Sequence, residues 1–302
     1  MATIEQGAEV TLGSAIKPPN KFRAQLRIII RALTQNPFTL LGTLIVTLFL
    51  LMAIFGPLVA PYEFDAQPPD QKLKPPSAEH LFGTDNLSRD VFSRVVIGSR
   101  DIISLAGFGT LMAVTLGAIL GLVVGYRGGW VDEVIMRLMD SILALPAGLL
   151  ALMLVGAVGP SRESVLFVII VVYIPIVARV VRSVVLDIKT KAFVEAAKMR
   201  GESNFYILSR EILPSVLPAL VVEASLRFSY AIFLVATLGF LGVGVQPPAP
   251  DWGLLVASAR NYASSAPWML FFPCAAIGLL VVGVNLMSDG LKSILQTSIT
   301  GG

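Results

Sequence analysis

The strongest constraint on the fold is a set of long segments in which no residue is charged. The windows 38–60, 102–126 and 267–287 contain no Asp, Glu, Lys or Arg. An α-helix needs about 20 mostly apolar residues to cross the roughly 30 Å hydrocarbon core of a bilayer, and each window reaches that length. Because 55% of the residues are hydrophobic and only 14% are charged, the chain is predicted to be a membrane protein with several crossings.

Three less uniform windows raise the predicted number of crossings to six: 140–162, 164–186 and 216–243. The fourth crossing contains Arg179 and Arg182, whose long side chains can reach the nearer membrane interface. The fifth contains Glu223 and Arg227, which are four residues apart and can neutralise each other on one helix face, either as a structural pair or in the pore. We therefore expect an all-α polytopic membrane protein with six transmembrane helices.

Six crossings place both termini on the same side of the membrane. The N-terminal tail lacks the apolar core of a cleaved signal, so the first crossing is expected to be an uncleaved anchor. With this tail in the cytoplasm, the inner segments carry about twice as many Lys and Arg residues as the outer ones, as the positive-inside rule requires. The predicted regions are a cytoplasmic tail 1–37, a first transmembrane helix 38–60, an extracytoplasmic loop 61–100, a core 101–290 with five transmembrane helices, and a cytoplasmic tail 291–302.

The longest inner loop, residues 187–215, is rich in charged residues. Good helix formers precede Gly201, which can adopt the left-handed conformation that ends a helix. Ser203 or Asn204 can cap a second short helix, which is predicted to end before Pro214. Composition alone therefore predicts an elbow of two short surface helices.

The order of residues in this loop supports a more specific interpretation than its composition does. Glu-Ala-Ala, three residues, Gly, ten further residues and Ile-Leu-Pro resemble the coupling loop of type I ABC importer permeases. In that family the loop seats in a groove of the cytoplasmic ATPase and transmits nucleotide-driven closure to the transmembrane helices. The matching positions are Glu195, Ala196, Ala197, Gly201, Ile212, Leu213 and Pro214.

A second segment, just before the second crossing, resembles the signature of dipeptide, oligopeptide and nickel permeases. Its residues include Phe82, Gly83, Thr84, Asp85, Arg89 and Asp90. Two further blocks, 128–140 and 242–253, are similar to the same subfamily. Taken singly, these blocks have simpler explanations: Thr84 or Asp85 could cap the following helix, and Trp252 could be an interfacial aromatic anchor.

Three positions depart from the subfamily pattern. Ser88 stands where relatives usually have glycine, Val235 where many peptide permeases have an acidic residue, and Ser288 where glycine is common. The last two positions lie in regions that are expected to face the pore or a partner. These departures weaken a prediction of the substrate more than they weaken the resemblance to the family.

The resemblance implies the type I ABC importer permease fold and the second, or C-type, permease of such an importer. The chain would be the pore subunit of an ATP-driven, binding-protein-dependent importer of di- or oligopeptides, or of nickel chelates, glutathione or another small solute. It also implies a bacterial inner-membrane location. The implied partners are a second homologous permease, two ATPase subunits or domains, an extracytoplasmic solute-binding protein and membrane lipid, with no nucleic acid.

The sequence contains no motif that predicts catalysis or a bound cofactor. It has no Gly-x-x-x-x-Gly-Lys-Ser/Thr loop, so ATP and Mg²⁺ are expected on the partner ATPase, and no catalytic residue or bound cofactor is predicted. One histidine, His80, and one cysteine, Cys274, leave little for a metal site.

The main rival class is an ion-driven secondary transporter, for which only Glu223 and Asp140 offer acidic groups in the crossings. A purely structural membrane subunit is also compatible with the composition. An intramembrane protease is disfavoured because its catalytic motifs are missing.

Overall fold

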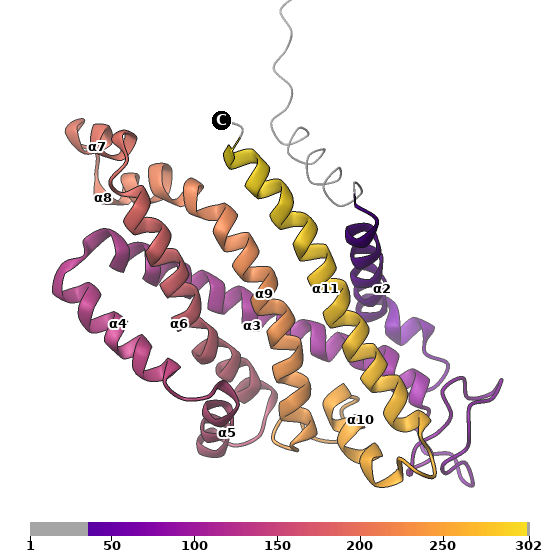
Figure 1. The fold of residues 1–302 in the computed structure, drawn as a ribbon. Coiled ribbons are helices and arrows are strands. Elements are labelled where there is room, and N and C mark those ends of the chain that lie inside the picture. The colour runs from indigo at the N-terminus through magenta and orange to yellow at the C-terminus, as the bar shows by residue number, and fades with distance from the viewer. Residues whose placement is uncertain (1–35, 301–302) are drawn as a thin grey trace, which may run out of the picture.

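The computed structural model describes residues 36–300, except for the side chains of 291 and 293–300. Most of the predicted tail 1–37 lies outside the described residues. Within the described range the regular elements are helices, and one isolated β-bridge joins Thr84 to Asp90. The helices of Figure 1 are α2 (Pro37–Val59), α3 (Val91–Arg127), α4 (Gly129–Leu143), α5 (Ala147–Val158), α6 (Arg162–Ile188), α7 (Ala192–Met199), α8 (Asn204–Tyr206), α9 (Leu213–Phe240), α10 (Trp252–Ala259) and α11 (Trp268–Thr300).

Most of the predicted crossings are single helices. Five helical stretches of the described chain are long and apolar enough to cross a bilayer: Pro37–Val59, Val91–Arg127, Arg162–Ile188, Asn204–Phe240 and Trp268–Gly290. They overlap five of the predicted windows, so the prediction of an all-helical membrane fold is confirmed. Beyond the predicted sixth crossing, α11 continues, and residues 291–300 of the predicted tail are helical.

The third predicted crossing differs from the others because it is broken. Its window is divided between α4 and α5, which are bent by 91° at a short break. Pro146 explains the break, since proline has no backbone N–H and disfavours helical geometry in the residue before it. Counted as one span, the bent pair gives the sixth crossing.

Helices α3 and α6 approach each other closely along a row of glycines. A Cβ atom on Gly121 would lie 2.5 Å from the carbonyl oxygen of Ala178, and one on Gly117 would lie 2.7 Å from Cβ of Val177. Gly125 continues the row at the same spacing of four residues. Small residues at this spacing allow helix backbones to pack closely in lipid, where van der Waals contact replaces the hydrophobic effect as the main attraction.

Helices α2 and α11 pack against each other in opposite directions. A Cβ atom on Gly42 would lie 2.6 Å from Cβ of Leu286, and one on Gly283 would lie 2.6 Å from Cγ2 of Ile45. In Figure 1, α2 begins at the same end of the bundle at which α11 terminates. Both ends of the described chain therefore lie at one end, as an even number of crossings requires.

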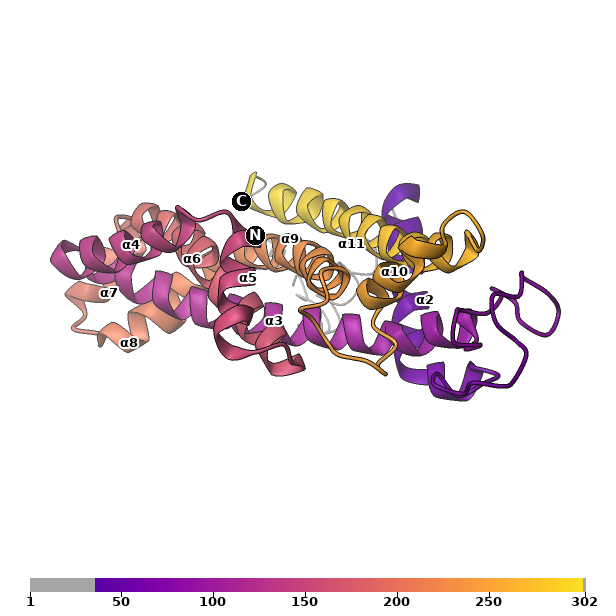
Figure 2. The same cartoon turned by 90° about the horizontal axis from the view of Figure 1, so that it is seen from below.

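The two ends of the bundle carry different features. Helices α7 and α8 lie at the end where α11 terminates, whereas α10 and the long loop (residues 60–90) lie at the other (Figure 1). Seen from below, α3 runs across most of the molecule between these features (Figure 2). We call these the elbow end and the loop end.

Ion pairs join α4 to α6. Arg182 donates from Nε and Nη2 to the two carboxylate oxygens of Asp132, at 2.5 and 2.6 Å. Arg179 pairs with Asp140. The two arginines of the fourth crossing therefore hold the α4 half of the broken span against α6, in addition to any contact with the membrane interface.

The charged pair in the fifth crossing forms as predicted. Nε of Arg227 lies 2.7 Å from Oε1 of Glu223, and both side chains are largely buried. The guanidinium also lies 5.7 Å and 5.1 Å from the ring centres of Tyr173 and Tyr230. The pair thus neutralises itself on one face of α9, where two aromatic rings surround the cation.

Two of the departures from the subfamily pattern are packed inside the chain. Val235 is 1% exposed in the apolar core, and Ser288 is 2% exposed, with its hydroxyl donating to the carbonyl oxygen of Val284 at 2.6 Å. Within the described residues, these two side chains therefore face neither a pore nor a partner, whereas the expectation for the surrounding regions stays a prediction. Their side chains are covered by the chain's own helices.

Candidate functional site

The elbow, residues 187–215, begins as the sequence predicts. Helix α7 is followed by Gly201, whose φ of +76° is the left-handed conformation that ends the helix. The hydroxyl of Ser203 accepts a hydrogen bond from the N–H of Tyr206 at 3.2 Å and caps α8. The sharp turn between α7 and α8 therefore depends on one residue that tolerates positive φ.

The prediction that the second short helix ends before Pro214 is wrong. A π-helical turn, Ile207–Ile212, joins α8 to α9, and a continuous helical stretch runs from Asn204 to Phe240. Pro214 occupies the second position of α9, where the wider turn before it has already changed the hydrogen-bond pattern. The elbow is thus rigidly continuous with the fifth crossing.

Some of the predicted coupling residues form the interior of the elbow. Four elbow side chains are buried in one apolar cluster with the end of α6: Val194, Ala197, Ile207 and Ile212. Ala197 and Ile212 therefore stabilise the elbow and are covered within this chain. Leu213 is half-buried and packs against the same cluster, and Ala196 is also half-buried.

The remaining predicted residues lie on the outer surface. Glu195, Gly201 and Pro214 are exposed, and the space around a Cβ atom on Gly201 is open to 4 Å. Sequence reasoning missed two neighbours, Met199 and Phe205, which are 83% and 81% exposed. Large apolar side chains in a polar loop were the available signal, because exposed apolar groups mark surfaces that a partner or a membrane covers.

Contacts with α3 fix the position of the elbow. Nζ of Lys189 donates to the carbonyl oxygen of Gly125 at 2.9 Å, and the hydroxyl of Tyr126 lies 3.2 Å from Oδ1 of Asn204. Nζ of Lys198 lies 5.6 Å from the centre of the Tyr126 ring. A force on the elbow would therefore reach α3 as well as α6 and α9.

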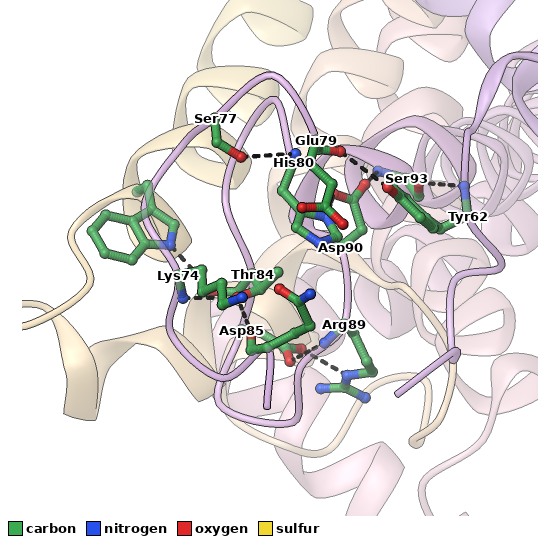
Figure 3. A network of polar contacts seen from close by, with 12 residues as sticks. Tyr62, Lys74, Ser77, Glu79, His80, Thr84, Asp85, Arg89, Asp90 and Ser93 are labelled. Atoms are coloured by element: carbon green, nitrogen blue, oxygen red, sulfur yellow. Dashed lines mark hydrogen bonds and ion pairs between the residues drawn. The ribbon is translucent and has the colours of Figure 1, made fainter. Parts of the chain in front are cut away.

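At the loop end, the predicted signature residues form a folded polar network (Figure 3). Oδ1 of Asp85 accepts the backbone N–H groups of Leu87 and Arg89 at 2.8 and 2.9 Å, and its Oδ2 accepts Nε of Arg89 at 2.7 Å. The hydroxyl of Thr84 accepts the N–H of Lys74 at 2.8 Å. Thr84 and Asp85 therefore organise the loop itself.

The residue that caps α3 is Asp90. Its Oδ2 accepts the N–H of Ser93 at 2.7 Å, so the alternative in which Thr84 or Asp85 caps this helix is wrong. Oδ1 of Asp90 lies 2.9 Å from Nδ1 of His80, and both side chains are 3% exposed. The single histidine of the chain thus holds the loop against the start of α3.

Phe82 and Gly83 anchor the long loop to α11. The Phe82 ring stacks on Phe272, with ring centres 3.7 Å apart. Gly83 has a φ of +72°, and a Cβ atom there would lie 2.7 Å from the indole nitrogen of Trp268. That nitrogen donates to the carbonyl oxygen of Thr84 at 3.1 Å. The signature residues therefore contact both α3 and α11, the first and last helices of the core.

Ser88 lies in a conformation that favours the glycine common in relatives. Its φ is +65°, which costs a residue with a side chain about 1–2 kcal/mol. We expect Ser88→Gly to raise the free energy of unfolding of the detergent-solubilised chain by about 0.5–1 kcal/mol. Ser264→Gly, at an exposed position without positive φ, is the control and should be neutral or slightly destabilising. Equal changes in both variants would contradict this account.

The block 242–253 covers the beginning of α3. Oδ1 of Asp251 accepts the N–H of Leu254 at 2.9 Å and caps α10, and burial raises the pKa of this carboxyl to about 6. Trp252 is fully buried and donates from its indole nitrogen to the carbonyl oxygen of Val95 at 2.9 Å. The alternative in which Trp252 is an interfacial anchor is therefore wrong.

Known proteins resemble this chain over nearly its whole length. It is 41% identical over 266 residues to the dipeptide transport system permease protein DppC of Alkalihalophilus pseudofirmus, with 88% of each chain covered. It is 40% identical to a probable D,D-dipeptide transport system permease protein of Escherichia coli, covering 95% of this chain and 97% of the relative. A glutathione transport system permease protein of Escherichia coli is 36% identical, with 94% of each chain covered.

The fold and the family models agree with these relatives. An inward-facing structure of the MetNI methionine ABC transporter matches with a TM-score of 0.55 and 18% identity, covering 68% of this chain and 95% of that chain. The model of the N-terminal transmembrane domain of oligopeptide transport permease C matches residues 24–76, and that of the binding-protein-dependent transport system inner membrane component matches residues 113–301. The chain therefore belongs to the family of inner membrane components of binding-protein-dependent transport systems, with an N-terminal transmembrane domain of the oligopeptide permease C type.

Proposed function

We propose that the chain is one of two pore-forming subunits of an ATP-driven importer of di- or oligopeptides. The observation that carries this proposal is the elbow, which presents Glu195 and Gly201 beside the exposed apolar side chains of Met199 and Phe205. This surface suits a partner groove, and its buried side is continuous with α6 and α9. The partner would be an ATPase subunit or domain that holds ATP and Mg²⁺.

The mechanism follows from the rigidity of the elbow. When ATP closes the ATPase pair, the elbow is pulled with it, and α3, α6 and α9 move together because contacts join each of them to the elbow. The pore then changes between inward-facing and outward-facing states. The permease contributes this two-state equilibrium, and the ATPase determines which state is favoured.

Peptides are the proposed solutes because two of the relatives named above are a dipeptide permease and a probable D,D-dipeptide permease. Glutathione, which is itself a peptide, is the alternative suggested by another relative. A separate capture protein outside the membrane would deliver the solute, and a second homologous permease would complete the pore.

The purified complex provides the direct test. The chain should copurify with an ATPase that contains a phosphate-binding loop, and proteoliposomes with the capture protein should take up dialanine only when ATP is present on the ATPase side. Uptake by the purified chain alone, driven by a proton or sodium gradient, would instead assign it to the secondary transporters.

We further propose that the elbow end and both termini are cytoplasmic and that the long loop is extracytoplasmic. A single cysteine placed at Lys191 should then react with an impermeant maleimide only in inverted vesicles, and one at Ser77 only in intact spheroplasts. Both residues are exposed, so access to reagent is limited by sidedness alone. These cysteines belong in a Cys274→Ser background. The opposite labelling pattern would overturn the proposed orientation.

A further inference from the structure

A small cavity at the loop end combines two arginines with polar groups that have no partner. Its volume is about 200 Å³, and it lies between the long loop, α3 and α10. Its polar lining consists of Asn86, Arg89, Arg94 and Ser258, and Leu87 and Leu254 are among its apolar walls. Nothing in the proposed coupling mechanism uses this cavity.

Arg94 is a buried cation that forms no direct ion pair within the described residues, although the charges of Asp85 and Asp65 act on it from a greater distance. The side chain is 1% exposed, and its Nη1 and Nη2 donate to the carbonyl oxygens of Phe64 at 2.8 Å and Ala249 at 3.3 Å. Its Nε is buried and has no hydrogen-bond partner in the part of the chain that the structure describes. A guanidinium removed from water normally pairs with an anion, because carbonyl groups alone do not balance its charge.

Arg89 supplies further donors to the same cavity. Its Nε faces Asp85 in Figure 3, at 2.7 Å from Oδ2, which leaves its two terminal nitrogens as further donors at the cavity wall. Asp85 already has partners at both oxygens, since its Oδ1 accepts two backbone N–H groups of the loop and its Oδ2 accepts Nε of Arg89. The carboxylate that neutralises Arg89 is therefore not free to pair with Arg94.

The other polar groups fit an acceptor-rich ligand. Oδ1 of Asn86 is buried and has no hydrogen-bond partner among the described residues. Rotating the side-chain amide by 180° would place its NH₂ group there, as a donor instead of an acceptor. The hydroxyl of Ser258 donates to the carbonyl oxygen of Leu255 at 2.9 Å. The free groups of the cavity are thus mostly N–H donors on two cations.

We propose that this cavity binds a carboxylate group between Arg89 and Arg94. The planar guanidinium matches the carboxylate in geometry and charge, and hydrogen bonds between ions are stronger than neutral ones. The apolar walls suit the carbon atoms that carry the carboxylate. If the proposed function holds, the carboxylate comes from the C-terminus of an arriving peptide or from an acidic side chain of the capture protein.

The first experiment tests the site without requiring transport. The purified full-length chain is unfolded by heat in sodium acetate and in sodium chloride at equal ionic strength and pH. Acetate should raise the apparent Tm of the wild type by about 2 °C or more relative to chloride, because a ligand that binds only the folded state stabilises it. Asn86→Asp places a carboxylate in the cavity and should abolish this difference.

Two further variants make the result specific. Ser258→Asp introduces a carboxylate from α10 and should also abolish the acetate effect, which covers the case in which Asn86→Asp does not fold. Asn261→Asp makes the same chemical change at an exposed position at the loop end and should retain the effect. An acetate effect that is missing in the wild type, or equal in the wild type and both cavity variants, would overturn the proposal.

Transport then identifies the source of the carboxylate. In proteoliposomes, Asn86→Asp should raise the KM for dialanine at least about tenfold without changing that for dialanine amide if the peptide supplies the carboxylate. If the capture protein supplies it, the variant should weaken binding of that protein equally with either solute. Unchanged KM and unchanged capture-protein binding would overturn the proposal. A wild type that shows the acetate effect but no ATP-dependent uptake would instead contradict the proposed function alone.

Discussion

The double variant Glu195→Lys, Gly201→Pro is expected to lower ATP-dependent uptake at least about 30-fold while the chain remains folded in the membrane. Both residues are exposed, so neither change removes a side chain from the buried cluster of the elbow. Proline cannot adopt the φ of +76° at position 201, and the turn that presents α7 would be lost. Uptake of dialanine by proteoliposomes and copurification of the ATPase measure the effect.

A nearby charge reversal separates loss of docking from a general change in charge. Asp187 is 71% exposed and forms only a 3.5 Å surface pair with Lys191. Asp187→Lys should therefore leave uptake within about twofold of the wild type, since such surface pairs contribute little. Wild-type uptake by the double variant would remove the elbow from the coupling mechanism.

Gly121→Leu is expected to destabilise the packing of α3 against α6 strongly. The first atom of the new side chain would lie 2.5 Å from the carbonyl oxygen of Ala178 and 2.8 Å from Cβ of Val181, so α3 and α6 would have to separate. Overpacking of this kind costs about 1–3 kcal/mol and more where backbone must move. The expected result is a lower apparent Tm and a smaller monodisperse fraction in detergent.

Gly156 provides the matched control for this prediction. It also lies in a helix, but the space around an added Cβ atom is open to 4 Å. Gly156→Leu should keep the apparent Tm of the isolated chain close to that of the wild type. If the two leucine variants were equally stable, close packing along the glycine row would not be what holds α3 to α6.

The crossings were predictable because lipid imposes a simple rule on a helix. A segment of sufficient length without charge satisfies its backbone hydrogen bonds internally and exposes only apolar side chains. The three windows without charge obeyed this rule directly, and the windows 164–186 and 216–243 form spanning helices although each contains two charged residues. The break at Pro146 was visible as a residue but not as a 91° bend, because the direction after a break depends on what the next helix packs against.

The candidate sites were predictable only in part. Gly201 and Ser203 act locally, so the turn and the cap of the elbow followed from residue type. The role of Asp90 did not, because three neighbouring side chains could each have capped α3 and only the path of the long loop selects one. Met199 and Phe205 required knowledge of exposure, which a sequence does not state.

The amino-acid sequence alone determined that this chain is helical, that it crosses a membrane several times, and that one polar elbow interrupts the crossings. These properties depend on residues close together in the chain, through helix periodicity, apolar length and turn chemistry. Tertiary structure alone decided that Val235 is covered and that Arg89 and Arg94 share a cavity with Ser258. Such features depend on distances between segments far apart in the sequence, which are set only when the helices pack.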